Sequence, residues 1–426
     1  MMADRDVAVS APSALSPQAE TRGIYEGWKV LALTMLMSIC AAGPVYYAYG
    51  NYALAFSAEF GASRTAINFG YTVVMLVGNV GSAPVGWLLD RWSVRNAAVA
   101  GAVGTGIGLA LVSVATQMWQ VLLLFTTLIA FADVFLGVVV VNYLLSHWFE
   151  RRRGLALSFA QIGSSAGAII FPPLTAYLTV AVGWRSVFTI YGVLVLVLIL
   201  PILRYARMPA TMPAVERLEG DRVAAVHASG KRHSYATIWR HAPFWIITLC
   251  TGTMIGINGG TMISLVPYAK SIGMDVATGA YLVSIIGIAA VSGKIVFGMV
   301  ADRIDLQWAM RGALLLVVGG QVMLATATPL AMQLGAILFG LSLGGMMPVW
   351  GLVSARVFGL ASYGVALGGT RTAMTPLAFV CPMLAGVIFD RYGSYQIAWF
   401  CYAALALLAC AATFLKPRWA QPLEAR

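Results

Sequence analysis

The chain has 426 residues, of which 60% are hydrophobic and only 10% are charged, whereas a soluble domain carries roughly 25% charged residues. This composition excludes a soluble globular protein, because the chain has too little charge to cover its own surface. The formal net charge of +11 would indicate nucleic-acid binding in a soluble protein, but here the positions of the charges matter more. We therefore expect the lipid bilayer, and no nucleic acid, as the partner.

Apolar blocks of about 20 residues, the length that spans a bilayer, recur along the whole chain. The first six are 28–49, 66–89, 97–116, 119–145, 154–181 and 185–203. The second six are 243–268, 277–301, 308–327, 330–355, 363–388 and 394–415. The sequence thus predicts an all-α membrane protein with twelve transmembrane helices in two six-helix halves, 26–203 and 243–415.

Three hydrophilic segments complete the chain. They are a tail at 1–25 that we expect to be disordered, a linker at 204–242 and a tail at 416–426. The first tail has no apolar region of the kind found in a signal peptide. Most of the 27 basic residues fall in cytoplasmic segments if the N-terminus is inside. The positive-inside rule then predicts that both termini are cytoplasmic and that the protein is multi-pass in the cell or inner membrane.

A short loop recurs at the end of the second span of each half. Gly86 to Arg91 reads Gly-Trp-Leu-Leu-Asp-Arg, Gly298 to Arg303 reads Gly-Met-Val-Ala-Asp-Arg, and the offset is 298 − 86 = 212 residues. A repeat at half-chain spacing is typical of transporters whose halves rock against each other. In such a loop the aspartate can accept hydrogen bonds from the start of the next helix, while the arginine faces anionic headgroups. The residues expected to act in the two loops are Gly86, Asp90, Arg91, Arg95, Gly298, Asp302 and Arg303.

This Gly-x-x-x-Asp-Arg pattern resembles the signature loop of the major facilitator superfamily. Two further stretches, Trp148-Phe-Glu-Arg151-Arg152-Arg153-Gly-Leu-Ala and Glu26-Gly-Trp28, resemble motifs of the monocarboxylate porters. The stretch 266–273, Val-Pro-Tyr-Ala-Lys-Ser-Ile-Gly, is similar to an outer loop of the oxalate/formate exchangers. The resemblance implies transport of small organic anions by alternating access.

Three ionisable residues, Asp133, Lys294 and Arg371, fall inside predicted spans and away from the span ends. Each costs roughly 2.5–3.5 kcal/mol at the centre of a helix, so each needs a partner or a purpose. At 1.5 Å per residue, Lys294 and Arg371 lie about 10 and 12 Å from the cytoplasmic ends of their spans. No carboxylate lies in the membrane part of the second half. A guanidinium fork and an ammonium at one depth therefore predict an anionic substrate.

The resemblance supports this prediction and also limits it. Carboxylate porters carry an arginine where Lys294 stands, and the oxalate/formate exchangers carry a lysine within one residue of Arg371, so the two identities look exchanged here. The aspartate and lysine of the monocarboxylate porters are replaced by Ala290 and Asn51, so their lactate–proton mechanism does not carry over. As alternatives, Lys294 snorkels toward the headgroups near Asp302, or Arg371 forms a structural bridge to a carbonyl or to Asp133.

Asp133 lies near the middle of its span, where a carboxylate can carry a proton. It can equally be a counter-ion for the cations in the empty site, or a structural residue bonded to hydroxyls. Further candidates for the wall of the site are Tyr71, Asn142 and Asn258, and less specifically Tyr46, Tyr47 and Tyr49, which the sequence places near the outer interface. The glycine clusters at 256–260 and 344–345 either let their helices bend or allow close packing.

The leading hypothesis is a secondary active transporter of mono- or dicarboxylates, working as a proton symporter or an anion exchanger. The alternative is a proton-coupled drug or sugar porter that uses Asp133, with the cations structural. We expect neither an enzyme nor a metal or cofactor site, because no nucleophile–base pair or metal-ligand spacing occurs among the four histidines and five cysteines. We also expect a monomer.

Overall fold

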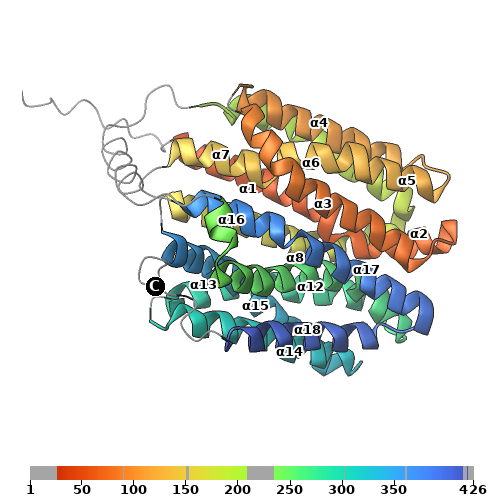
Figure 1. Cartoon of the computed structure of the whole chain (residues 1–426). Helices are drawn as coiled ribbons and strands as arrows, with labels where there is room; N and C mark the ends of the chain where they lie inside the picture. The colour runs from red at the N-terminus through yellow and green to blue at the C-terminus, as the bar shows by residue number, and fades with distance from the viewer. Residues whose placement is uncertain are drawn as a thin grey trace, which may run out of the picture.

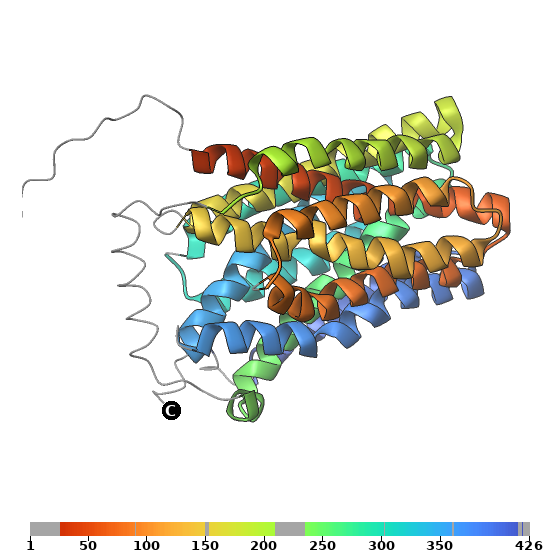
Figure 2. The ribbon, with the colours of Figure 1, turned by 90° about the horizontal axis from the view of Figure 1, so that it is seen from above.

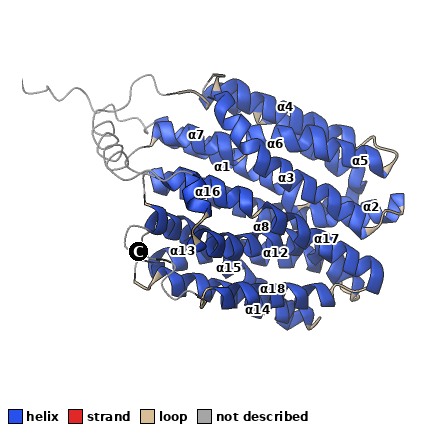
Figure 3. Ribbon diagram, in the orientation of Figure 1, coloured by secondary structure: helices blue, strands red, loops and turns tan. Residues whose placement is uncertain are grey.

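A computed structural model of the protein describes residues 26–89, 91–149, 153–208, 235–301, 303–359, 362–415 and 420. These residues form long helices that run side by side in one bundle (Figures 1 and 3), and no strand occurs among them, which confirms the predicted all-α class. The first helix begins and the last helix ends at the same end of the bundle (Figure 2). We call this end the terminal end, and the opposite end the distal end.

The helices before residue 209 are α1 (Glu26–Ala42), the π-helical turn η1 (Gly43–Tyr47), α2 (Tyr49–Phe60), α3 (Arg64–Leu89), α4 (Val94–Val112), α5 (Met118–Leu124), the π-helical turn η2 (Phe125–Ile129), α6 (Ala130–Leu136), α7 (Val138–Trp148), α8 (Arg153–Val197) and α9 (Ile199–Tyr205). The later ones are α11 (Tyr235–Trp239), α12 (Ala242–Ser271), α13 (Val276–Ala301), α14 (Leu306–Ala325), α15 (Pro329–Phe358), α16 (Tyr363–Ala373), α17 (Thr375–Tyr392) and α18 (Gln396–Ala412). Among the described residues, nine helical runs are long and apolar enough to cross a membrane. The number twelve stays a prediction.

One of these nine runs joins two of the predicted spans. α8 and α9 together cover the blocks predicted at 154–181 and 185–203, and Gly183 is the point inside α8 that departs from helical geometry, with φ 81° and ψ 153°. A positive φ of this kind is readily adopted only by glycine. The chain therefore turns at Gly183 without a loop.

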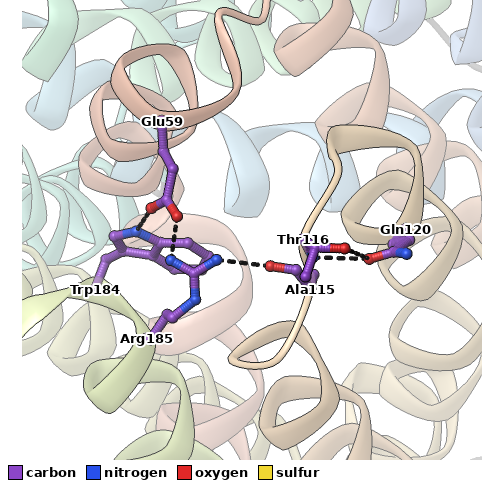
Figure 4. A network of polar contacts seen from close by, with 6 residues as sticks. All are labelled: Glu59, Ala115, Thr116, Gln120, Trp184 and Arg185. Carbon is purple, nitrogen blue, oxygen red and sulfur yellow. Dashed lines mark hydrogen bonds and ion pairs between the residues drawn. The ribbon is translucent and has the colours of Figure 1, made fainter.

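The first helical run is longer than predicted, because α1, η1 and α2 continue to Phe60 and end at Gly61 in the left-handed conformation, φ 60°. A polar network holds this extension at the distal end (Figure 4). The Glu59 carboxylate accepts hydrogen bonds from Trp184 Nε1 and from the Arg185 guanidinium. Arg185 also donates to the carbonyl of Ala115 at 2.8 Å. The network fastens the end of α2 to α8 and to the segment that follows α4.

The buried side chains form two hydrophobic cores, one mainly from residues before position 209 and one from residues after position 234. One contains buried side chains from Val30 to Ala206, joined by Ile263 of α12, and the other contains buried side chains from Ile238 to Ala420. We call the helices around them the first and second sides. The predicted domain boundaries stay a prediction.

Several helices of the second side approach so closely that only glycine fits between them. A Cβ on Gly344 of α15 would lie 2.0 Å from the carbonyl oxygen of Ala290 on α13, and a Cβ on Gly256 of α12 would lie 2.4 Å from the carbonyl oxygen of Leu377 on α17. α12 is one continuous helix through its glycine cluster. Of the two hypotheses for these glycines, close packing is the one that this geometry supports.

Candidate functional site

Hydrogen bonds of polar side chains join the two sides where they meet. On one face α8 packs against α13, and Ser284 Oγ donates to the carbonyl of Ile169 at 2.7 Å. On the other face α3 packs against α17, and Asn68 Nδ2 donates to the carbonyl of Pro382 at 2.7 Å. Hydrogen bonds that cross between the sides place polar groups at an interface that transport would have to rearrange.

This interface is closed at the distal end by a carboxylate. Asp390 of α17 accepts from the backbone nitrogens of Arg64 and Thr65 at 2.9 Å each, and from Thr65 Oγ1 at 2.6 Å. A Cβ on Gly386 would lie 2.8 Å from the Cα of Thr65. Asp390 therefore satisfies free amides at the N-terminus of α3, where the helix dipole also favours a negative charge.

Arg371 lies on α16 and is half-buried. Its Nε donates a hydrogen bond to Oδ1 of Asn79 on α3, at 3.2 Å, so the bond crosses from the second side to the first. Arg371 also lies close enough to Tyr46 of η1 for the two to interact electrostatically. The three residues come from three different segments of the chain and form the centre of the candidate site.

Asp133 is hydrogen-bonded to Tyr46. The Tyr46 hydroxyl donates to Asp133 Oδ2 at 2.9 Å, and within the described chain Oδ1 of this buried carboxylate has no hydrogen-bond partner. Tyr46 is part of the π-helical turn η1, and Asp133 lies between the π-helical turn η2 and the break in the helix at Gly137. Such irregular turns are frequent at functional sites, because they redirect side chains within a membrane span.

Lys294 of α13 is bonded to the first side. Its Nζ donates to the carbonyl of Gln161 at 2.8 Å and to Ser165 Oγ at 2.9 Å, both on α8. This differs from the snorkelling alternative, because the ammonium reaches another helix inside the bundle. No hydrogen bond in the described part of the chain joins Lys294 to Arg371 or to a substrate-wall candidate.

The remaining wall candidates lie at different distances from this centre. Tyr71 is 2% exposed, and its ring packs edge-on against Tyr46 with 6.2 Å between centroids. Asn258 of α12 has a buried Oδ1 without a partner among the described residues. Asn142 of α7 is half-buried and bonds to neither cation there. Tyr46 and Tyr71 thus belong to the interior, whereas the sequence placed Tyr46 near an aromatic belt.

The signature loops are only partly described. Asp90, Asp302, Arg151 and Arg152 lie outside the described residues, and the surroundings of Gly86 and the side chain of Arg153 are not described either. Arg91 and Arg303 are exposed. Arg95 Nε donates to the carbonyl of Ala206 at 3.3 Å. A Cβ on Gly298 would meet no neighbouring atom within 4 Å. The roles predicted for the two loops therefore stay predictions.

Both cations of the candidate site have neutral partners. Arg371 donates to an amide oxygen, and Lys294 donates to a carbonyl and a hydroxyl. Neither residue forms an ion pair with a carboxylate in the described ranges. A charge in a low-dielectric interior is costly when it is not compensated, and here only neutral dipoles compensate the two charges.

Sequence reasoning did not identify Asn79 and Gln161, and it named Ser165 only within the continuation, to residue 167, of the stretch that resembles the monocarboxylate-porter motif. Asn79 is the more informative omission, because an amide inside an apolar span is a recognisable signal. Gln161 and Ser165 belong to the segment that carries the monocarboxylate-porter motif, but their contact with Lys294 depends on the packing of α8 on α13.

Comparison with known proteins identifies the family. Residues 34–368 match the family described as the Major Facilitator Superfamily. The chain belongs to this superfamily. Its members are transporters, so the chain is classed as a multi-pass membrane transporter and not as an enzyme.

Two curated relatives are similar over most of their length. Monocarboxylate transporter 13 of Bos taurus is 27% identical over 84% of this chain and 76% of its own. Monocarboxylate transporter 12 of Homo sapiens is 23% identical over 87% of this chain and 77% of its own.

Solved structures share the fold. One is a bacterial homologue of the human lysosomal transporter Spinster, inward-facing and occupied, with a TM-score of 0.72, 15% identity, and coverage of 92% of this chain and 97% of that one. Another is a D-xylose-proton symporter, with a TM-score of 0.69, 14% identity, and coverage of 90% and 96%.

Proposed function

We propose that this protein transports small organic anions, mono- or dicarboxylates, by alternating access between two halves, 26–203 and 243–415. The anion binds to Arg371 and Lys294, with Tyr71, Asn258 and Asn142 on the wall of the site and Asp133 as the proton-coupling or counter-ion group. Both termini face the cytoplasm of the cell or inner membrane. The protein acts as a proton symporter or as an anion exchanger, and as a monomer.

The observation that carries this proposal is the neutral coordination of both cations. Arg371 is bonded to an amide and Lys294 to a carbonyl and a hydroxyl. Two positive charges held in this way favour a negatively charged solute over a neutral one. A carboxylate suits the pair, since it can accept two parallel hydrogen bonds from a guanidinium. The names of the two curated relatives, both monocarboxylate transporters, support the same class.

The test is a counterflow screen in proteoliposomes with labelled acetate, lactate, oxalate and succinate, with and without a pH gradient. We expect at least one of these anions to exchange. Arg371→Gln should lower that signal by about 100-fold or more, because a charge-assisted bidentate contact of about 3 kcal/mol is lost. Arg391→Gln removes an exposed cation from α17 and should leave the signal unchanged. Carboxylate transport that survives Arg371→Gln would contradict the proposed site.

A second candidate is a proton-coupled drug or sugar porter, and it is favoured by one observation. Asp133 is 6% exposed, and only one of its oxygens has a partner in the described chain. A carboxylate in that state can carry a proton without an anionic substrate. Labelled xylose and a cationic dye belong in the same screen. Uptake of either one, driven by a pH gradient and abolished by Asp133→Asn, would favour this candidate.

A further inference from the structure

Asn79 is the hydrogen-bond partner of the Arg371 guanidinium in the described part of the protein. It lies half-buried in α3, on the first side, whereas Arg371 lies in α16, on the second side. Asn79 Oδ1 accepts the hydrogen of Arg371 Nε at 3.2 Å. In the described part of the protein, neither Nη atom of Arg371 has a hydrogen-bond partner.

The bond to Asn79 limits the ways in which the Arg371 guanidinium can bind a carboxylate. An arginine side chain can hold a carboxylate side-on, through Nε and one Nη, or end-on, through its two Nη atoms. Asn79 occupies Nε, so the side-on edge is taken by a neutral acceptor. The end-on edge keeps its donors for a second partner.

The neutral amide of Asn79 is an acceptor that leaves the charge of Arg371 available to an anion. Its amide oxygen fixes the plane of the guanidinium without neutralising the charge, whereas a carboxylate at the same place would form an ion pair and compete with an anionic substrate. Tyr46 interacts electrostatically with Arg371 and donates its hydroxyl hydrogen to Asp133. In the described ranges, Asp133 is therefore linked to Arg371 through Tyr46 and not by a direct ion pair.

We propose that Asn79 is a positioning residue for anion binding: it anchors Arg371 Nε and so directs the two Nη atoms to receive one carboxylate end-on. This inference rests on the proposed function. It adds a dependence on conformation, because Asn79 and Arg371 lie on opposite sides of the interface. The anion meets a correctly oriented Arg371 only while α3 and α16 are packed together.

The experiment compares variants of the full-length protein in proteoliposomes, with the carboxylate that gives the largest wild-type counterflow signal. Asn79→Asp places a competing carboxylate on Arg371, and Asn79→Leu removes the acceptor at similar volume. Each should raise the KM about tenfold, the effect of losing or misdirecting one charge-assisted hydrogen bond. The maximal rate should change less than about threefold. Asn79→Gln keeps an amide acceptor and should stay within about threefold of the wild-type KM.

The control is Asn96→Asp, the same chemical change at an exposed position of α4 on the first side. It should leave the KM within about twofold. A double-mutant cycle adds a readout that a purely structural role would not move: in an Arg371→Lys background, Asn79→Leu should have no further effect on the KM, because lysine has no Nε to anchor.

The outcomes separate the two proposals. If the wild type exchanges no carboxylate, the proposed function fails and this inference fails with it. If the wild type exchanges a carboxylate and both Asn79→Leu and Asn79→Asp keep its KM, this inference alone is overturned. If Asn79→Asp does not reconstitute, Asn79→Leu and the double-mutant cycle decide.

Discussion

A buried carboxylate depends on the few groups that it contacts. Asp133 receives one hydrogen bond in the described chain, from the Tyr46 hydroxyl at 2.9 Å. Tyr46 is in turn held by its ring against Tyr71. The stability of this part of the bundle is therefore sensitive to one hydroxyl.

We predict that Tyr46→Phe destabilises the protein by about 1–3 kcal/mol, because it leaves a buried acceptor without a partner. The measurement is thermal unfolding of the purified protein in detergent. Tyr47→Phe is the matched control, since the Tyr47 hydroxyl has only a 3.4 Å contact with Ser164, and it should cost less. In an Asp133→Leu background the effect of Tyr46→Phe should nearly vanish. An equal loss in both backgrounds would mean that the bond to Asp133 is not the cause.

The sequence was sufficient to find the charged residues of the candidate site but not their partners. Asp133, Lys294 and Arg371 are conspicuous because charge is rare in apolar spans. Their partners Tyr46, Asn79 and Ser165 lie between 87 and 292 residues away in the chain. Such contacts depend on how helices pack, which periodicity and composition do not encode.

At the scale of helices, glycine decides how closely two elements approach. α13 and α15 meet backbone to backbone, with Gly344 against Ala290 and Gly293 against Leu341. In membranes, where lipid is as apolar as leucine, close van der Waals packing of this kind is a main source of helix association. These contacts leave no room for a side chain between α13 and α15 at the two glycines.

We predict that Gly344→Ala destabilises the protein by about 1–3 kcal/mol or prevents its folding, because the new methyl group overlaps a carbonyl and the helices must separate. Gly298→Ala is the control: it makes the same change on α13 at a position with nothing within 4 Å. Size-exclusion profiles and thermal unfolding of the two variants measure the difference. Equal behaviour of the two would show that the helices can adjust without cost.

The boundaries of the helices followed from composition except where polar contacts extend them. The span predicted at 277–301 agrees with α13, Val276–Ala301. The span predicted at 28–49 was too short, because the helical run continues to Phe60. The hydrogen bonds that Glu59 accepts from Trp184 and Arg185 could not be predicted from the local sequence, since they join residues more than 120 positions apart.

At the scale of the whole molecule, the contact between the two sides is asymmetric along the bundle. At the distal end, Asp390 caps the start of α3 with three hydrogen bonds. A movement that opens this end must break them, and it exposes two backbone amides of α3. Asp390 thus contributes to the relative stability of the conformation described here.

We predict that Asp390→Asn speeds hydrogen–deuterium exchange at residues 64–67 by about tenfold, because loss of a charged cap costs about 1 kcal/mol or slightly more. Peptide-resolved mass spectrometry in detergent or nanodiscs measures this. Asp275→Asn makes the same change directly before α13, which begins at Val276 on the second side. It should leave the exchange rate of residues 64–67 unchanged. Unchanged exchange in Asp390→Asn would show that the distal end is held by other contacts.

The length of the first helical run has a consequence for the fit between protein and membrane. The 35 residues from Glu26 to Phe60 extend over roughly 50 Å at 1.5 Å each, whereas the hydrocarbon layer is about 30 Å thick. The excess at the distal end carries Glu59, whose polar contacts suit the headgroup layer and water. The apolar part of this run can therefore tilt or shift within bilayers of different thickness without drawing that polar network into lipid.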